Sequence, residues 1–168
     1  LNNKQTIVVH MKMTGHLMSG KFDKFIHFYA TLTGGKYLAL SDMRKFASVC
    51  LVESAKISEH PGIAELGPDP LKIKLKEFVN ILRTKKGPVK SVLLDQRVLA
   101  GIGNIYSDEI LWATNVHSLS LAEKIPKEAL VEMFKNTKNI LKKSIALGGD
   151  SMSDYRNALG KKGGFQNF

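Results

Sequence analysis

The segment from Leu93 to Trp112 constrains the fold of this chain most, because it joins two apolar helical patterns through a turn with two glycines. Helical spacing before the turn is kept by four positions: Val89, Val92, Leu93 and Gln96. Gly101 and Gly103 permit tight backbone geometry, and Asn104 begins the second helix. Because the first N–H groups of a helix lack backbone partners and attract anions, the segment predicts a helix-turn-helix that binds phosphate.

A dinucleotide-binding glycine loop is the alternative for the same residues, since Gly101-Ile-Gly103 has part of its pattern. That loop follows a strand and requires a third glycine at position 106. Here the preceding stretch has helical spacing and position 106 is Tyr106. The sequence therefore excludes this alternative.

Three further stretches carry a family resemblance: His10-Met-Lys-Met-Thr-Gly15, Asp42-Met-Arg-Lys-Phe46, and Gly148-Gly149 followed by Asp154-Tyr-Arg-Asn-Ala-Leu-Gly160 and Gly164-Phe-Gln166. In this order, and together with 93–112, they closely resemble the bacterial formamidopyrimidine-DNA glycosylases. The resemblance extends over nearly the whole chain. It implies a base-excision-repair glycosylase with AP lyase activity, which removes formamidopyrimidine and 8-oxoguanine from duplex DNA by flipping the damaged nucleotide out of the stack.

The family's nucleophile is the secondary amine of an N-terminal proline, which attacks the sugar C1′, expels the base and forms a Schiff base before the strand is cleaved. The chain starts at Leu1, and Thr6 to His10 has the pattern of a strand already in progress. We therefore expect the catalytic proline and the family's four-cysteine zinc finger to lie outside this chain. No catalytic residue and no metal ligand is assigned within it, and zinc is expected in the full-length protein.

The resemblance assigns Met13, Arg44 and Phe46 as the residues that enter the gap left by the everted nucleotide. Their chemistry suits this role, because a thin Met and a flat Phe can unstack a base step. Arg can donate hydrogen bonds to the widowed base. The alternative makes Met13 and Phe46 core residues and Arg44 a partner in a surface salt bridge. Ala47 stands where the family usually has glycine.

Phosphate contacts are expected from a second group: Lys12, Lys85, Lys90, Gly103 and Asn104. The alternatives are solvated surface lysines and, for Asn104, a helix N-cap. His10 and His27 are possible DNA contacts, although the family tends to have a histidine where this chain has Phe25. A lone strand histidine is usually structural.

The last part of the chain, 148–166, resembles the family's lesion-recognition loop, with matches at Gly148, Gly149 and Tyr155. The alternative is an ordinary disordered terminus.

The net charge is +10, from 25 Lys and Arg against 15 Asp and Glu, and it predicts attraction to a polyanion. The expected partner is damaged double-stranded DNA. Cys50 is the only cysteine, which excludes a disulfide framework and fits a reducing cytosol; we expect it to be a small buried residue of a strand. No membrane-spanning run is present. Through the resemblance, we expect a monomer in the bacterial cytoplasm, associated with the nucleoid.

These patterns predict an α+β fold. Residues 1–60 are assigned to the C-terminal part of an antiparallel β-sandwich domain, 61–70 to a linker, and 71–168 to a helix-two-turn-helix domain that includes the loop 148–166. Two other functions stay open. An endonuclease VIII-like glycosylase for oxidised pyrimidines is disfavoured by Arg44-Lys-Phe46 and Tyr155-Arg-Asn, and a non-enzymatic nucleic-acid binder does not explain the ordered Met13, Arg44 and Phe46.

Overall fold

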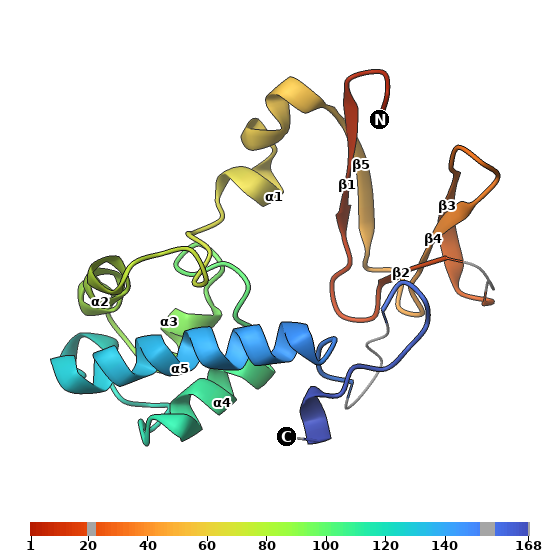
Figure 1. Ribbon diagram of the computed structural model, residues 1–168. Coiled ribbons are helices and arrows are strands. Elements are labelled where there is room, and N and C mark those ends of the chain that lie inside the picture. The colour runs from red at the N-terminus through yellow and green to blue at the C-terminus, as the bar shows by residue number, and fades with distance from the viewer. Residues whose placement is uncertain (20–22, 152–156, 168) are drawn as a thin grey trace. The chain divides into compact units, whose positions relative to one another are not determined.

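The computed structural model describes residues 1–19, 23–151 and 157–167. The chain divides into two units, each with its own dense set of contacts (Figure 1). Unit 1 comprises Leu1–His60 and Ser144–Phe168, and unit 2 comprises Pro61–Lys143. Sequence patterns group 71–168 in one domain, whereas the contacts group 144–168 with the strands. One such contact is the hydrogen bond from Ser19 N to Ala158 O, at 2.8 Å.

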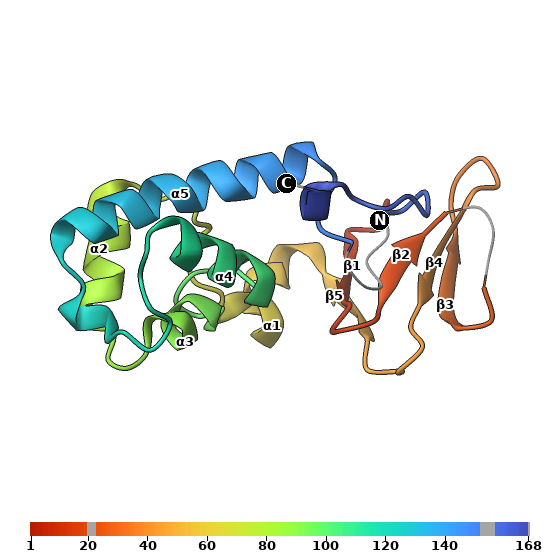
Figure 2. The ribbon, with the colours of Figure 1, turned by 90° about the horizontal axis from the view of Figure 1, so that it is seen from below.

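Unit 1 is built on antiparallel strands, which together with the helices of unit 2 confirm the α+β class. The strands are β1 (Gln5–His10), β2 (His16–Met18), β3 (Ile26–Thr31), β4 (Tyr37–Ser41) and β5 (Ser48–Glu53). β1 pairs with β5 in a two-stranded ribbon (Figure 1), and the other three form a sheet in the order β2-β4-β3 (Figure 2). Gly34 and Gly35, with φ of 85° and 71°, lie in the turn between β3 and β4.

The side chain of Cys50 is exposed on β5, so the prediction of a buried cysteine is wrong. Cys50 pairs with Val8 of β1, and the neighbouring Val49 and Val52 are the half-buried residues of β5. Successive side chains of a strand point to opposite faces, so Cys50 lies on the opposite face from its neighbour Val49.

Two helical elements follow β5, the 3₁₀ helix η1 (Ser54–Glu59) and the single turn α1 (Pro61–Ala64). The rest of the predicted linker is packed. Gly67 N donates to Gln96 O at 2.8 Å, and a Cβ at Gly67 would come within 2.7 Å of backbone atoms of Arg97 and Val98. Ala100 N donates to Pro68 O at 3.2 Å. Residues 67–68 therefore support the turn that precedes α4.

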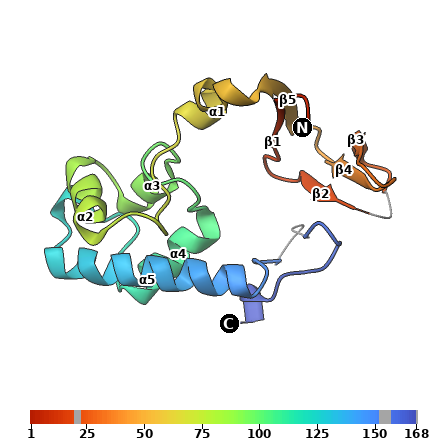
Figure 3. The ribbon, with the colours of Figure 1, turned by 45° about the horizontal axis from the view of Figure 1, so that its top comes forward.

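Unit 2 is helical. Its elements are α2 (Leu75–Thr84), α3 (Val89–Leu94), α4 (Asn104–Ala113), the 3₁₀ helix η2 (Ala122–Lys124) and α5 (Lys127–Ala146), whose last turn belongs to unit 1. In Figure 3, α5 runs along the group of shorter helices. Their core includes buried apolar side chains from the helices and from the turn between α3 and α4: Phe78, Leu82, Leu93, Leu99, Ile102, Ile110, Leu130 and Met133. The two helices predicted on either side of the glycines are confirmed, and α4 begins at Asn104 as expected.

The chain returns to unit 1 at the end of α5. Gly148 and Gly149 have φ of 77° and 90°, conformations that favour glycine, and Gly149 N donates to Ser144 O at 2.8 Å. A short 3₁₀ helix, η3 (Phe165–Asn167), ends the described chain.

Candidate nucleic-acid interface

Two tight turns of unit 1 carry the three residues assigned as intercalating. Met13 lies in the turn between β1 and β2, and Arg44 and Phe46 lie in the turn between β4 and β5. The Thr14 hydroxyl of the first turn donates a hydrogen bond to the Asp42 carboxylate of the second, although the two residues are 28 positions apart. This bond joins the two turns.

The three side chains are in contact with one another and exposed. Arg44 Nη1 donates to Met13 Sδ at 3.3 Å, and Arg44 Cζ lies 4.9 Å from the centroid of the Phe46 ring. Met13 is 73% exposed and Phe46 is 56% exposed, so neither is a core residue. Within the described residues, Arg44 also forms no salt bridge. We call Met13, Arg44 and Phe46 the wedge trio.

Asp42 organises the second turn. Its side chain is buried, with 1% of its surface exposed. Oδ1 accepts a hydrogen bond from Arg44 N at 3.2 Å, and Oδ2 accepts one from Ala47 N at 2.7 Å. The hydrogen bonds from Thr14 and from the Ala47 N–H lower the pKa of Asp42 from 3.8 to about 2. The carboxylate is therefore ionised at neutral pH and holds the backbone at Arg44 and Ala47, on either side of Phe46.

Both turns contain a lysine in the left-handed region, Lys12 with φ of 53° and Lys45 with φ of 59°. Such a conformation is costly for a residue with a Cβ and persists only where the surroundings enforce it. Gly15 has a different constraint, because a Cβ there would lie 2.4 Å from Met11 O. The backbone around the wedge trio is thus fixed by close contacts.

The two histidines contribute to the same turns. His10 Nδ1 accepts a hydrogen bond from Lys12 N at 3.1 Å. His27 Nε2 lies 2.9 Å from Asp42 O, and because a carbonyl oxygen only accepts, the proton is on Nε2. Asp42 N in turn donates to Phe25 O at 3.0 Å. His10 and His27 therefore support the backbone beside the trio.

In unit 2, α4 begins at the glycine turn (95–103) without a side-chain cap. Gly103 is the N-cap residue and Asn104 the first helical residue, so the N-cap alternative for Asn104 is wrong. Gly101 has φ of 103°, which favours glycine, whereas Gly103 has ordinary extended geometry with open space around it. The start of α4 can therefore be approached closely by an anion such as phosphate.

Gln96 braces the glycine turn. Its Oε1 accepts a hydrogen bond from Gly101 N at 2.8 Å, and its Nε2 donates to Ile102 O at 2.8 Å and to Leu94 O at 3.0 Å. Gln96 keeps helical spacing with Val89, Val92 and Leu93, but α3 ends at Leu94 and Gln96 lies in the glycine turn. The helix ends because Asp95 Oδ1 accepts a hydrogen bond from Arg97 N at 3.0 Å, a local turn that competes with helix continuation.

The three lysines assigned to phosphate differ in their surroundings. Lys12 and Lys85 are exposed, and Lys85 is the C-cap residue of α2. Lys90 lies on α3, and its Nζ lies 2.7 Å from Asp108 Oδ1 and 2.9 Å from Oδ2. Asp108 is on α4, four residues after Asn104, so Lys90 bridges the two helices close to the start of α4.

The ends of the loop 148–166 are tied together. Phe165 N donates to Gly149 O at 3.1 Å, and Gly163 N donates to Ser151 Oγ at 2.8 Å. The Gln166 side chain also connects the two ends of the loop, because Oε1 accepts a hydrogen bond from Ser151 N and Nε2 donates one to Gly163 O. Tyr155, assigned to lesion recognition, lies outside the described residues.

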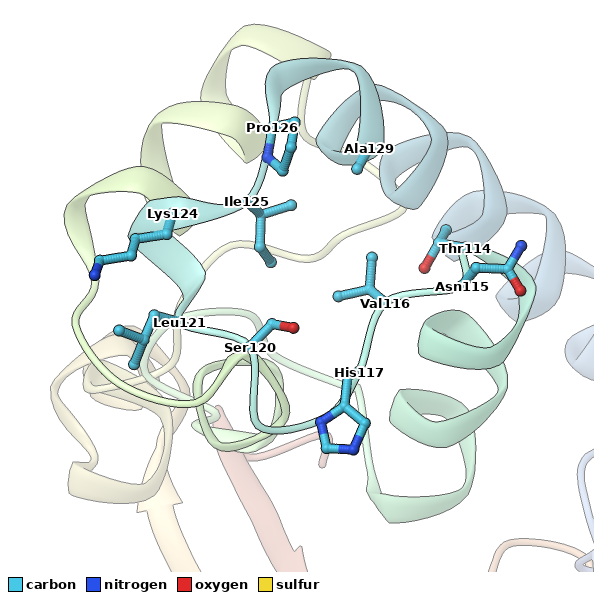
Figure 4. Close-up of a pocket in the computed structure, with 10 residues that line it drawn as sticks. All are labelled: Thr114, Asn115, Val116, His117, Ser120, Leu121, Lys124, Ile125, Pro126 and Ala129. Atoms are coloured by element: carbon cyan, nitrogen blue, oxygen red, sulfur yellow. The ribbon is translucent and has the colours of Figure 1, made fainter.

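A cavity of about 590 Å³ opens at the C-terminal end of α4, the opposite end from Asn104 (Figure 4). Its polar lining comes from Thr114, Asn115, His117, Ser120 and Lys124 and contains no carboxylate. A pair of carboxylates, as in hydrolysis of sugar glycosides, is therefore not present there.

The described residues do not fit a zinc site. Cys50 is exposed on β5, and no group of three His, Cys, Asp or Glu side chains lies close enough to hold a metal ion in the part of the chain that the structure describes. No helix among the described residues is long and apolar enough to cross a membrane.

The short helices α3 and α4, joined by the glycine turn, place unit 2 in the helix-two-turn-helix class. The family model described as "Formamidopyrimidine-DNA glycosylase H2TH domain" matches residues 66–156, more than half of the chain. The chain belongs to the formamidopyrimidine-DNA glycosylase (Fpg/MutM) family.

Similar proteins extend over both units. Formamidopyrimidine-DNA glycosylase of Lactobacillus helveticus is 39% identical over 99% of this chain, and that of Herpetosiphon aurantiacus is 36% identical over 97%. The crystal structure of MutM (Fpg) from Thermus thermophilus matches 98% of the chain with a TM-score of 0.90 and 31% identity. A complex of Lactococcus lactis Fpg with DNA containing an abasic site matches 97% with a TM-score of 0.85 and 28% identity. The chain spans 61–62% of the length of these proteins.

Proposed function

We propose that this chain is the DNA-engaging part of a base-excision-repair glycosylase and AP lyase that removes oxidised purines from duplex DNA. The observation that carries the proposal is the exposed wedge trio on turns that Asp42 holds together. Single exposed apolar residues are common on protein surfaces, but here two of them contact one arginine on adjoining turns, and such a contiguous exposed group suits a surface contact. Family membership and the Fpg complex with abasic-site DNA support DNA as the partner.

The wedge trio has the chemistry needed to stabilise an extrahelical nucleotide. Phe46 offers a flat ring that replaces a base in the stack, and Met13 supplies a narrow, deformable side chain beside it. The Arg44 guanidinium is in contact with both and retains further N–H donors for the base opposite the gap. Unstacking costs a few kcal/mol per base step, which these contacts would offset.

The second part of the proposed interface is the start of α4. Backbone N–H groups near Gly103 and Asn104, with Lys12, Lys85 and Lys90, would hold the phosphates. We assign the loop 148–166 to recognition of the everted base, as the family resemblance implies. We assign the attack on the sugar C1′ to the amine of the family's N-terminal proline. We likewise assign the family's zinc ion to residues other than those described. We expect a monomer in the bacterial cytoplasm, working on nucleoid DNA.

Binding to a duplex with one stable abasic-site analogue, against the same duplex undamaged, tests this proposal. We expect this chain to prefer the abasic duplex by about tenfold or more, because filling the gap recovers part of the unstacking free energy. Phe46→Ala should reduce the preference to within about threefold of unity.

Leu51→Ala is the matched control, because Leu51 is also 56% exposed and lies on β5 of the same unit. It should leave the preference unchanged. Two outcomes would return Phe46 to a structural role. One is an equal loss of the abasic preference in both variants. The other is a loss of about 3–5 kcal/mol in the stability of Phe46→Ala, which is typical of a buried phenylalanine.

A further inference from the structure

Lys90 does not present a free ammonium group to phosphate. Its Nζ contacts both carboxylate oxygens of Asp108, at 2.7 Å and 2.9 Å, and only 28% of its side chain is exposed. Asp108 is 52% exposed. The ion pair joins α3 to α4 one helical turn from Asn104, so a carboxylate stands next to the proposed phosphate-binding helix start.

The ion pair and a DNA phosphate need the same donors. A lysine ammonium has three N–H groups, and two close contacts to Asp108 engage most of its capacity. A carboxylate is also an unfavourable neighbour for a phosphate, because the two negative charges repel each other and the helix N-terminus attracts both. A contact between Lys90 and a DNA phosphate therefore requires Asp108 to release the Lys90 ammonium group or to share it.

We propose that Asp108 lowers the affinity of this site for DNA by competing with DNA phosphate for Lys90. The proposal rests on the phosphate-binding role proposed above for Lys90 and the start of α4. Asp108 lowers the affinity for every duplex, damaged or not, because the phosphates carry no information about the lesion. The ratio between the affinities for damaged and undamaged duplex is set instead by the wedge trio, whose contacts form only at a gap in the stack.

Equilibrium binding of this chain to a labelled undamaged duplex, at several salt concentrations, tests the competition. Asp108→Asn keeps the size of the side chain and removes its charge, so we expect tighter binding at low salt. With Asn, Lys90 can release one more counterion from the DNA, which steepens the dependence of log affinity on log salt by about 0.9. The affinity ratio between variant and parent should then shrink about 3.5-fold over a fourfold rise in salt.

Glu132→Gln is the matched control, because Glu132 also forms an ion pair, with Lys135 at 2.6 Å, on the exposed face of α5. It changes the net charge by the same amount, and it should leave both the affinity and the salt dependence near the parent values. An equal gain in Glu132→Gln and Asp108→Asn would mean that net charge alone is responsible, and the proposal would be overturned.

Lys90→Ala separates this proposal from the one it rests on. If Lys90→Ala leaves affinity unchanged, the phosphate role of Lys90 is wrong, whatever Asp108→Asn does. If Lys90→Ala weakens binding and Asp108→Asn weakens it too, Asp108 positions Lys90 and does not compete with DNA. Weakening by Lys90→Ala together with tightening by Asp108→Asn, lost in the double variant, supports competition.

Discussion

The wedge trio and the glycine turn are organised in the same way but present different chemical groups. In unit 1, the carboxylate of Asp42 accepts backbone N–H groups and the Thr14 hydroxyl, and the turns display three side chains. In unit 2, the amide of Gln96 holds the glycine turn, and the turn displays backbone at Gly103. A single polar side chain holds each turn, and we propose that the exposed groups decide whether the site recognises a distorted stack or any phosphate.

This comparison gives the two regions separable effects on DNA binding. Damage to the wedge turns should remove the preference for a gap in the stack and spare general affinity. Damage to the glycine turn should reduce general affinity and spare the preference. Binding to the abasic and the undamaged duplex, measured side by side, reports both quantities for each variant.

Asp42→Ala should have the largest effect. The substitution leaves three donors without their acceptor, the Thr14 hydroxyl and the N–H groups of Arg44 and Ala47, and it frees the turn that carries Arg44 and Phe46. We expect the preference for the abasic duplex to fall by about tenfold or more, to near unity. Affinity for the undamaged duplex should stay within about threefold of the parent.

Asp42→Asn keeps one oxygen acceptor and should retain part of the preference. If Asp42→Ala weakened binding to both duplexes equally, the wedge turns and the glycine turn would not be independent, and the comparison would fail. Circular dichroism and thermal unfolding show whether each variant is folded at the assay temperature.

Gln96→Ala should have the next largest effect, on unit 2. It removes the exposed bond to Gly101 N and the partly buried bond to Ile102 O, and leaving a buried backbone group unpaired costs about 1–3 kcal/mol at most. We expect affinity for both duplexes to fall by the same factor, about three- to tenfold, with an unchanged preference.

Asn136→Ala is the control for Gln96→Ala, since its exposed amide also donates to a backbone carbonyl, that of Glu132 at 3.0 Å, but on α5. It should bind both duplexes like the parent. A change of preference in Gln96→Ala would contradict the assignment of the glycine turn to phosphate alone.

The two regions also differ in what could be predicted from the sequence. The helices around the glycine turn follow from apolar spacing and from two glycines, because these are local properties. The spacing did not show where α3 ends. Gln96 keeps the helical spacing, but the hydrogen bond from Arg97 N to Asp95 Oδ1 turns the chain before it. The wedge trio was found through family resemblance, because the contact between Met13 and Arg44 joins residues 31 positions apart and no local pattern encodes it.

Several features escaped prediction for physical reasons. Asp42 stood inside a recognised motif, but only the fold shows that its carboxylate is buried and receives hydrogen bonds from two turns. An Asp followed by N–H donors two and five residues later is a turn signal that could have indicated it. β2 has only three residues, too few for an alternating pattern. Cys50 was misassigned because composition gives no information about which strand face is covered.

The loss of folding stability in acid through Asp42 is the smallest effect that we expect, because the Asp42 carboxylate stays ionised at neutral pH. Asp42 has its pKa lowered from 3.8 to about 2 by the hydrogen bonds from Thr14 and Ala47 N, so the folded state binds this proton less readily than the unfolded state. The stabilisation is fully present above the unfolded pKa of 3.8 and is lost as pH falls from there towards 2.

In unit 2, the hydrogen bonds and charge of Arg97 also lower the pKa of Asp95, and the sign is the same, but the Arg97 side chain is 70% exposed, so solvent screens the pair. Melting temperatures from pH 6 to pH 2 should therefore converge for the parent and Asp42→Asn below about pH 4, and change little between them above it. Asp95→Asn should show a weaker convergence. If Asp42→Asn tracked the parent in parallel at every pH, the Asp42 carboxylate would not stabilise the fold, and the glycine turn would be the only one of the two sites that depends on a single polar side chain.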